Sequence, residues 1–291
     1  MILISGATGK VGSELIKKLS GGKHAVRALV RDRKKAGTIA LPGIEVVEGD
    51  FTKPKTLSRA LDGVEQLFLL LPSSSEVEQL QCNFVDAARK HRVKHIVKLS
   101  QLGADKRSSG RFQRYHGAVE DHMMKSGVAY TFLRPNLFMQ GLLNFRTMIS
   151  SQGAFFAPAG NARVSVVDVR DIASIAKKML TESGHEGKAY DITGPEALTH
   201  LEMAEQLSQA TGRSIGYVSI SPESMRETLL SIGLQAWQAE GVVEDYEHYR
   251  RGEAERVTST VRDLTGYEGT FFSQFAMDYA GSFSGKAAGK A

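Results

Sequence analysis

The stretch SGATGKVG, residues 5–12, decides how the beginning of this chain folds. It follows the strand-like run MILIS and leads into KVGSELIKKLS, whose apolar residues recur at helical spacing. Gly6, Gly9 and Gly12 therefore occupy a predicted strand-to-helix turn, at a spacing one residue different from the common G-x-G-x-x-G form. The first glycine permits the turn, the second lets backbone N–H groups approach a pyrophosphate, and the third lets the helix pack closely. The stretch predicts a dinucleotide-phosphate site, with a plain tight turn as the alternative.

Strand-like and helix-like segments alternate over the first two-thirds of the chain. Strict alternation with short connections is typical of right-handed βαβ units. We therefore expect an α/β fold with a Rossmann-like, doubly wound parallel sheet. The expected strands are residues 1–5, 24–30, 44–49, 66–72, 95–100 and 129–135, and the expected helices are residues 10–20, 55–63, 76–91 and 111–127.

The pattern changes after Gly194. Residues 164–180 indicate a strand followed by a helix, and 188–194 a further strand, whereas the later segments are mainly helical. We predict an NAD(P)-binding domain over 1–195, with residues 136–160 contributing to the cleft. A smaller, mainly helical substrate-binding cap is expected over 196–283, and a loose tail over 284–291. Such a cap would cover the carboxyl ends of the strands, where open α/β sheets bind ligands.

Composition narrows the class of protein. The net charge of +5 is spread along the chain, so nucleic acid is not an expected partner. A single cysteine, Cys82, rules out an internal disulfide, fits a reducing compartment and is expected to be buried filler. No basic leader or membrane-length apolar stretch is present, which indicates a cytoplasmic location and no membrane partner. No histidine or cysteine spacing predicts a metal site.

The one concentrated basic cluster, RDRKKAG at 31–37, falls directly after the second predicted strand. NAD sites usually have a carboxylate there, which holds the ribose hydroxyls. This chain has Arg31, whose planar fork suits the 2′-phosphate of NADP. Asp32 follows at once and competes for the NAD interpretation, and a solvated helix start is a further alternative. We predict NADP(H) in preference to NAD(H).

Several segments together resemble one family. SGATGKVG, LVRDRKKA, EGDF, HGAVEDHMMKSG and YTFLRPNLFMQ are similar to the NmrA-like group of atypical short-chain dehydrogenases. That group includes type 2 NAD(P)H:quinone oxidoreductases, triphenylmethane reductases and redox-sensing regulators. The resemblance extends through the C-terminal half, where GLQAWQAEGVVEDYEHYRRG and LTGYEGTFFSQFAMDYA look like the cap helices of the family.

The resemblance implies a set of cofactor contacts, all at the carboxyl ends of predicted strands. Asp50 and Phe51 should lie by the adenine, although a turn residue and a core residue are the plain alternatives. The contacts expected with the phosphates are Gly6, Ala7, Thr8, Gly9, Lys10, Val11 and Gly12, those beside the nicotinamide ribose are Leu71, Pro72 and Ser73, and those bordering the nicotinamide are Ser100, Pro135, Asn136, Leu137 and Phe138.

The usual acid of short-chain dehydrogenases is missing. Typical members carry Tyr-x-x-x-Lys on the fifth helix, which places both side chains on one helix face. Aligning on Glu120 puts Phe112 and His116 in these positions, and the register that starts at Tyr115 puts Val119 in place of the lysine. Ser100 and His116 remain as candidate catalytic residues, with a structural histidine as the alternative for His116.

The missing pair favours an acceptor that needs no acid from the enzyme. A reduced ketone becomes an alkoxide, whereas a reduced quinone or dye delocalises its electrons and can take a proton from water. We expect an NADPH-dependent oxidoreductase for a small conjugated acceptor (quinone, azo or triphenylmethane dye), acting as a monomer or homodimer. The alternative is a non-catalytic NADP(H)-sensing regulator that acts through a protein partner. A sugar-nucleotide epimerase is disfavoured by the missing pair.

Overall fold

The computed structural model describes residues 1–284, and the chain divides into two units. Unit 1 comprises Met1–Pro135 and Val169–Asp191, and unit 2 comprises Asn136–Asp168 and the chain from Ile192 onward. The sequence-based division expected one domain over 1–195, whereas here 136–168 groups with the later helices. The reason is burial, since apolar side chains of 136–168 such as Met139 and Phe155 pack into the hydrophobic core of unit 2. The tail expected over 284–291 lies outside the described residues except for Ser284.

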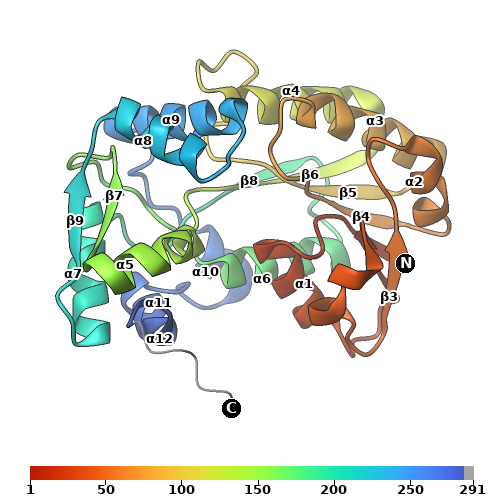
Figure 1. The fold of residues 1–291 in the computed structure, drawn as a ribbon. Helices are drawn as coiled ribbons and strands as arrows, with labels where there is room; N and C mark the ends of the chain where they lie inside the picture. Colours follow the sequence, from red (N-terminus) through yellow and green to blue (C-terminus); the bar gives the residue numbers. More distant parts are fainter. Residues whose placement is uncertain (285–291) are drawn as a thin grey trace. The chain divides into compact units, whose positions relative to one another are not determined.

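Unit 1 is built on a seven-stranded sheet with the order β3-β2-β1-β4-β5-β6-β8 (Figure 1). Strands β1 to β6 pair in parallel, with Leu3 opposite Arg27 on one side and Leu67 on the other. The Rossmann-like sheet predicted from the alternation is confirmed. The strands are β1 (Ile2–Ile4), β2 (Val26–Val30), β3 (Ile44–Glu48), β4 (Gln66–Leu69), β5 (His95–Leu99), β6 (Ala129–Pro135) and β8 (Lys188–Ile192).

Helices cover both faces of this sheet. Helices α1 and α6 pack against each other on one face, and α2, α3 and α4 follow one another on the other face (Figure 1). The central strands are therefore buried on both sides, which explains their continuous apolar runs. The helices are α1 (Lys10–Leu19), α2 (Pro54–Leu61), α3 (Val77–Lys90), α4 (Arg111–Ser126) and α6 (Val169–Thr181). The predicted basic helix start after β2 is instead two short 3-10 turns, η1 (Arg33–Lys35) and η2 (Gly37–Ile39).

Unit 2 is mainly helical, as the sequence predicted, and has a two-stranded parallel sheet of β7 and β9. Strand β7 was not predicted. The strand expected at the start of 164–180 makes only isolated bridges, from Val164 to Leu198 and from Phe138 to Val167. The elements are η3 (Met139–Phe145), α5 (Arg146–Gln152), β7 (Ala154–Ala157), α7 (His200–Thr211), β9 (Gly216–Ser219), α8 (Pro222–Ser231), α9 (Ala236–Arg250), α10 (Thr260–Thr265), α11 (Phe272–Asp278) and α12 (Ala280–Phe283). No helix in residues 1–284 is long and apolar enough to cross a membrane.

Candidate functional site

The glycine turn brings the first turn of α1 against the end of β1. Gly6 has φ +63°, and a Cβ there would lie 2.7 Å from the Leu70 side chain. A Cβ at Gly12 would lie 2.2 Å from the Gly6 carbonyl oxygen, so no larger residue fits at that position. At Gly9 the nearest atom is the same oxygen, at 3.2 Å, a tight contact but not an overlap. The fold itself therefore demands Gly6 and Gly12 more strongly than Gly9, which fits a role for Gly9 towards a ligand.

The beginning of α1 is suited to an anion. Gly9 is the N-cap residue, no side chain caps the helix, and its first turn contains no acidic residue. Backbone N–H groups and the positive end of the helix dipole at such a terminus favour a phosphate. The residues present therefore fit the pyrophosphate of a dinucleotide.

Ser5 joins this turn to the end of the neighbouring strand. Its hydroxyl lies 2.9 Å from the Phe68 carbonyl oxygen and accepts a hydrogen bond from the Leu70 N–H at 2.9 Å. These bonds place the stretch Leu71–Pro72–Ser73 directly after β4 and beside the glycine turn. Two groups of predicted cofactor contacts thus meet at one edge of the sheet.

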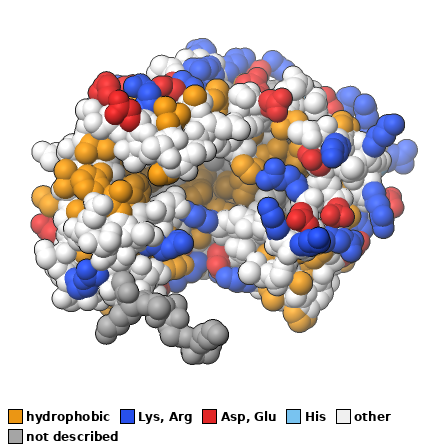
Figure 2. Space-filling view, in the orientation of Figure 1, with side chains coloured by type: hydrophobic (Ala, Val, Ile, Leu, Met, Phe, Trp, Pro, Cys, Tyr) orange, Lys and Arg blue, Asp and Glu red, His pale blue; other side chains and the backbone are white. Residues whose placement is uncertain are grey.

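The charged side chains after β2 differ in whether another group of the protein already holds them. Asp32 accepts a hydrogen bond from the Lys34 N–H at 2.9 Å and so caps η1. Arg33 donates to the Val46 carbonyl oxygen at 2.9 Å. The Arg31 side chain is exposed, and across residues 1–284 no hydrogen bond or ion pair holds it. Figure 2 shows lysine and arginine side chains gathered on the right, over the part of unit 1 that contains β2 and β3. Arg31, the first residue after β2, is therefore available for a 2′-phosphate, as are the exposed side chains of Lys34 and Lys35.

Asp50 and Phe51 lie after β3, where the resemblance places the adenine. Asp50 accepts hydrogen bonds from the Thr52 N–H at 2.9 Å and the Thr52 hydroxyl at 2.8 Å, and these bonds lower the pKa of its carboxyl. The Phe51 ring packs edge-on against Phe84, with centroids 4.6 Å apart. Both residues thus have local structural roles, and their contact with adenine stays a prediction.

A buried ion pair fixes Ser100. Glu120 is 2% exposed, and its two carboxylate oxygens accept hydrogen bonds from Nε and Nη2 of Arg134. It also accepts the Ser100 hydroxyl hydrogen at 2.5 Å. Removal of the Arg134 charge would leave the buried Glu120 carboxylate unpaired, at a cost of about 3–5 kcal/mol. Ser100 is consequently a donor to Glu120 and has no free hydroxyl proton.

His116 contacts a lysine that sequence reasoning did not single out. Lys98, on β5, is fully buried, and its Nζ lies 2.6 Å from His116 Nδ1 and 3.2 Å from the Leu99 carbonyl oxygen. Burial lowers the pKa of Lys98 to about 7, and burial together with the Lys98 charge holds the pKa of His116 well below its ordinary value. When Lys98 is protonated it can only donate to Nδ1, and the neutral imidazole then carries its proton on Nε2. A lysine inside the otherwise apolar run HIVKL was the available signal.

Tyr115 was named only as the start of an alternative register, yet it reaches a predicted contact. Its hydroxyl lies 3.1 Å from the Ser73 hydroxyl, and its ring lies 4.1 Å from the His116 ring. Phe112 stands edge-on to Tyr115, with centroids 6.3 Å apart. The helix therefore presents a phenol beside Ser73 even though the tyrosine–lysine pair is absent.

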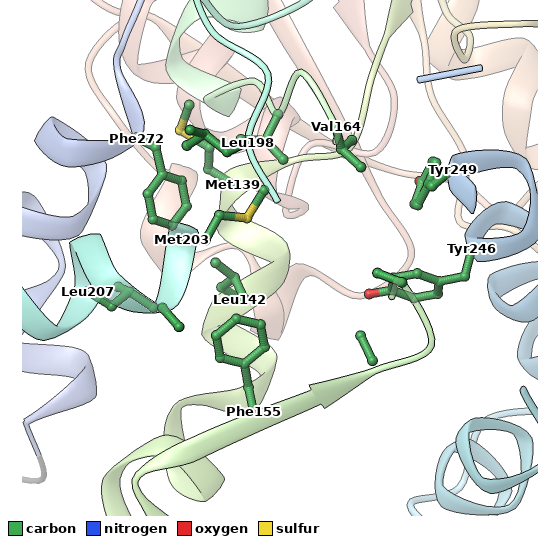
Figure 3. Close-up of a cluster of buried hydrophobic side chains, with 14 of the residues drawn as sticks. Met139, Leu142, Phe155, Val164, Leu198, Met203, Leu207, Tyr246, Tyr249 and Phe272 are labelled. Carbon is green, nitrogen blue, oxygen red and sulfur yellow. The ribbon is translucent and has the colours of Figure 1, made fainter. Parts of the chain in front are cut away.

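Unit 2 contains a cavity of about 880 Å³. Its walls include Leu137 and Phe138, which the resemblance assigns to the border of the nicotinamide. The remaining lining comes mainly from η3, α5, α7, α8, α9 and α11. Its charged residues are Arg146 and Asp245, and its apolar residues include Met139, Leu142, Met203, Met225, Leu229 and Phe272. Figure 3 shows several of these side chains directed towards one another in the core of the unit. Flat apolar molecules suit such walls.

A parallel sheet whose first strand leads through a glycine turn into an uncapped helix defines a Rossmann-type dinucleotide-binding protein. The chain belongs to the NmrA-like family, which matches residues 1–269. The resemblance drawn from the sequence is thus confirmed.

Individual relatives cover almost the whole chain. The NAD(P)H azoreductase of Xenophilus azovorans is 36% identical, over 97% of this chain and 99% of its own length. Quinone oxidoreductase 2 of Escherichia coli is 31% identical, over 94% and 96%. The structure of Citrobacter sp. triphenylmethane reductase complexed with NADP(H) superposes with a TM-score of 0.84 at 29% identity, over 96% of this chain and 100% of that one. Its cofactor is the one that Arg31 predicts for this chain.

Gly9→Val tests the phosphate site. A branched side chain there would occupy the space over the helix terminus and prevent about two charge-assisted hydrogen bonds. At about 1.5–3 kcal/mol each, their loss should weaken NADPH binding by about a hundredfold or more in a calorimetric titration. Gly281→Val is the control, because nothing lies within 4 Å of a Cβ at Gly281. Near-normal affinity in folded Gly9→Val protein would leave only a structural turn.

Arg31→Ala tests the choice of cofactor. The lost contact with the 2′-phosphate should weaken NADPH binding by about tenfold to a hundredfold and leave NADH binding unchanged. Arg33→Ala is the matched control, because the Val46 carbonyl already holds that guanidinium. Equal losses for both cofactors, or an equal NADPH loss in the control, would contradict a specific role for Arg31.

Lys98→Met tests the buried lysine through pH. Between pH 7 and 10 the unfolded chain keeps a proton on Lys98 that the folded protein releases, because the folded pKa is about 7. Wild-type stability should therefore rise relative to the variant by up to about 1.4 kcal/mol per pH unit in urea unfolding. Both proteins should carry Cys82→Ala, since burial raises the pKa of that thiol to about 11 and it also titrates there. A constant difference across this range would contradict a neutral Lys98.

Proposed function

We propose that this chain is an NADPH-dependent oxidoreductase that transfers a hydride to a quinone-like or other conjugated acceptor, such as a quinone, an azo dye or a triphenylmethane dye. The observation that carries the proposal is the large apolar cavity of unit 2, in a chain whose unit 1 has an uncapped glycine turn. The relatives support it, because they are an azoreductase, a quinone oxidoreductase and a triphenylmethane reductase.

The residues of unit 1 hold the cofactor. The glycine turn binds the pyrophosphate, Arg31 the 2′-phosphate, and the stretch Leu71–Ser73 the ribose on the nicotinamide side. Bound NADPH would supply a hydride, which carries two electrons. A quinone or azo group would then take one proton from water, whereas a cationic triphenylmethane dye needs none. The chain's task is therefore to bind and orient the two reactants.

The polar groups near the nicotinamide side act as neutral residues. His116 is neutral because burial and Lys98 disfavour its protonated form, and the Ser100 hydroxyl donates to Glu120. Neither is a charged acid suited to protonating an alkoxide. We therefore propose Ser100 and His116 as orienting groups, which agrees with acceptors whose reduced forms are delocalised.

The acceptor occupies the cavity of unit 2. Leu137 and Phe138, which the resemblance assigns to the border of the nicotinamide, line this cavity. We propose that the acceptor is a small molecule and that nucleic acid is not a partner. A monomer or homodimer in the cytoplasm remains the prediction for its state and location.

A screen of NADPH oxidation at 340 nm tests the proposal. Purified protein should oxidise NADPH with menadione, methyl red or malachite green and should leave simple ketones unreduced. Turnover should disappear in Gly9→Val and persist in Gly281→Val. Tight NADPH binding without turnover of any acceptor would reject this function and favour the NADP(H)-sensing regulator.

A further inference from the structure

Three polar side chains on the wall of the unit 2 cavity could form hydrogen bonds with a ligand. His200, Tyr246 and Tyr249 line it, and their exposures are 3%, 9% and 4%. In the part of the chain that the structure describes, none of these three side chains makes a hydrogen bond, and His200 Nδ1 is fully buried without a partner. A ligand in the cavity could use the polar atoms of these side chains that face the cavity, whereas the enclosed His200 Nδ1 is out of its reach.

These rings form a row from two helices. His200 is the first residue of α7, whose start is fixed by a capping box between Thr199 and Glu202. The Tyr246 ring, on α9, has its centroid 5.7 Å from that of His200 and 5.5 Å from that of Tyr249. In Figure 3 the Tyr246 hydroxyl points towards the middle of the apolar cluster. The row thus places polar atoms on the cavity wall, which also carries Arg146 and Asp245 among its mainly apolar residues.

All three groups are neutral around pH 7. Burial lowers the pKa of His200 to about 4 and raises the pKa of Tyr246 and of Tyr249 above its ordinary value. Because Nδ1 is enclosed by protein, the ring edge with Nε2 borders the cavity. We assign the imidazole proton to Nε2, since an enclosed N–H is costlier to leave unpaired than an enclosed lone pair. Each side chain can then donate one hydrogen bond into the cavity.

We propose that His200 and Tyr246, supported by Tyr249, anchor the oxygen or nitrogen atom of an uncharged planar acceptor, a quinone carbonyl or an azo nitrogen. This inference rests on the proposed function and specifies its substrate class. Arrival of the hydride places negative charge on that atom, and donors in a low-dielectric cavity stabilise it more strongly than the neutral ground state. A cationic triphenylmethane dye takes the hydride on its central carbon, and that carbon accepts no hydrogen bond.

The test compares two acceptors in three variants. His200→Phe and Tyr246→Phe should each lower kcat/KM for menadione by about tenfold to a hundredfold. They should change kcat/KM for malachite green and the Kd of NADPH by less than about twofold. Tyr217→Phe is the matched control, because its ring lies 5.3 Å from His200 but its hydroxyl already donates to the Ala157 carbonyl at 2.8 Å. It should leave both acceptors unchanged, and either donor variant decides the outcome if the other does not fold.

The outcomes separate this inference from the proposed function. Menadione turnover that survives within about twofold in both donor variants, or equal losses on both acceptors, overturns the anchor and leaves the reductase function standing. If the wild type reduces no acceptor, the function fails, and quenching of the single tryptophan, Trp237 on α9, measures menadione binding directly. A Kd raised about tenfold in the donor variants then supports the anchor. An unchanged Kd, or no binding to the wild type, rejects it.

Discussion

The close approach of α1 to the ends of β1 and β4 is the constraint on which the rest of unit 1 depends. A Cβ at Gly12 would lie 2.2 Å from the Gly6 carbonyl oxygen, so the helix can begin only where two glycines permit the contact. Ser5 locks the end of β4 to the same turn through the Leu70 N–H. One steric requirement therefore sets the crossing of the first helix over the sheet and creates an uncapped helix terminus where phosphates bind.

Unit 1 also buries more charge than a stable core requires. The charges of Glu120 and Arg134 neutralise each other. Burial lowers the pKa of Lys98, which favours its neutral amine beside His116 and so reduces the free-energy cost of burying it. A buried ion pair is weak evidence for stability, because apolar residues of the same shape would often do as well. These groups lie on β5, β6 and α4, around the helix where related dehydrogenases carry their acid. The helix retains polar groups there, a neutral His116 and the Glu120 carboxylate that Arg134 pairs.

The two units offer binding sites that suit different parts of the reactants. Unit 1 exposes Arg31 and an uncapped helix terminus, which suit the anionic parts of a dinucleotide. Unit 2 has a cavity whose mainly apolar lining suits a conjugated molecule, and polar residues such as Arg146, Asp245 and His200 also line it. Family membership and the activities by which the relatives are named agree with this division, because azo compounds and quinones are planar acceptors with weakly basic nitrogen or oxygen atoms.

The sequence by itself determined the parallel sheet, the glycine turn and the basic residue after β2, because these depend on local periodicity and on backbone freedom at single glycines. It did not reveal β7, since Ala154–Ala157 becomes a strand only by pairing with β9, some sixty residues later. Nor did it show that Lys98 meets His116 or that His200 stands beside Tyr246. Those pairs join separate elements, and their protonation states follow from burial. Only the tertiary structure decides which side chains lose water together.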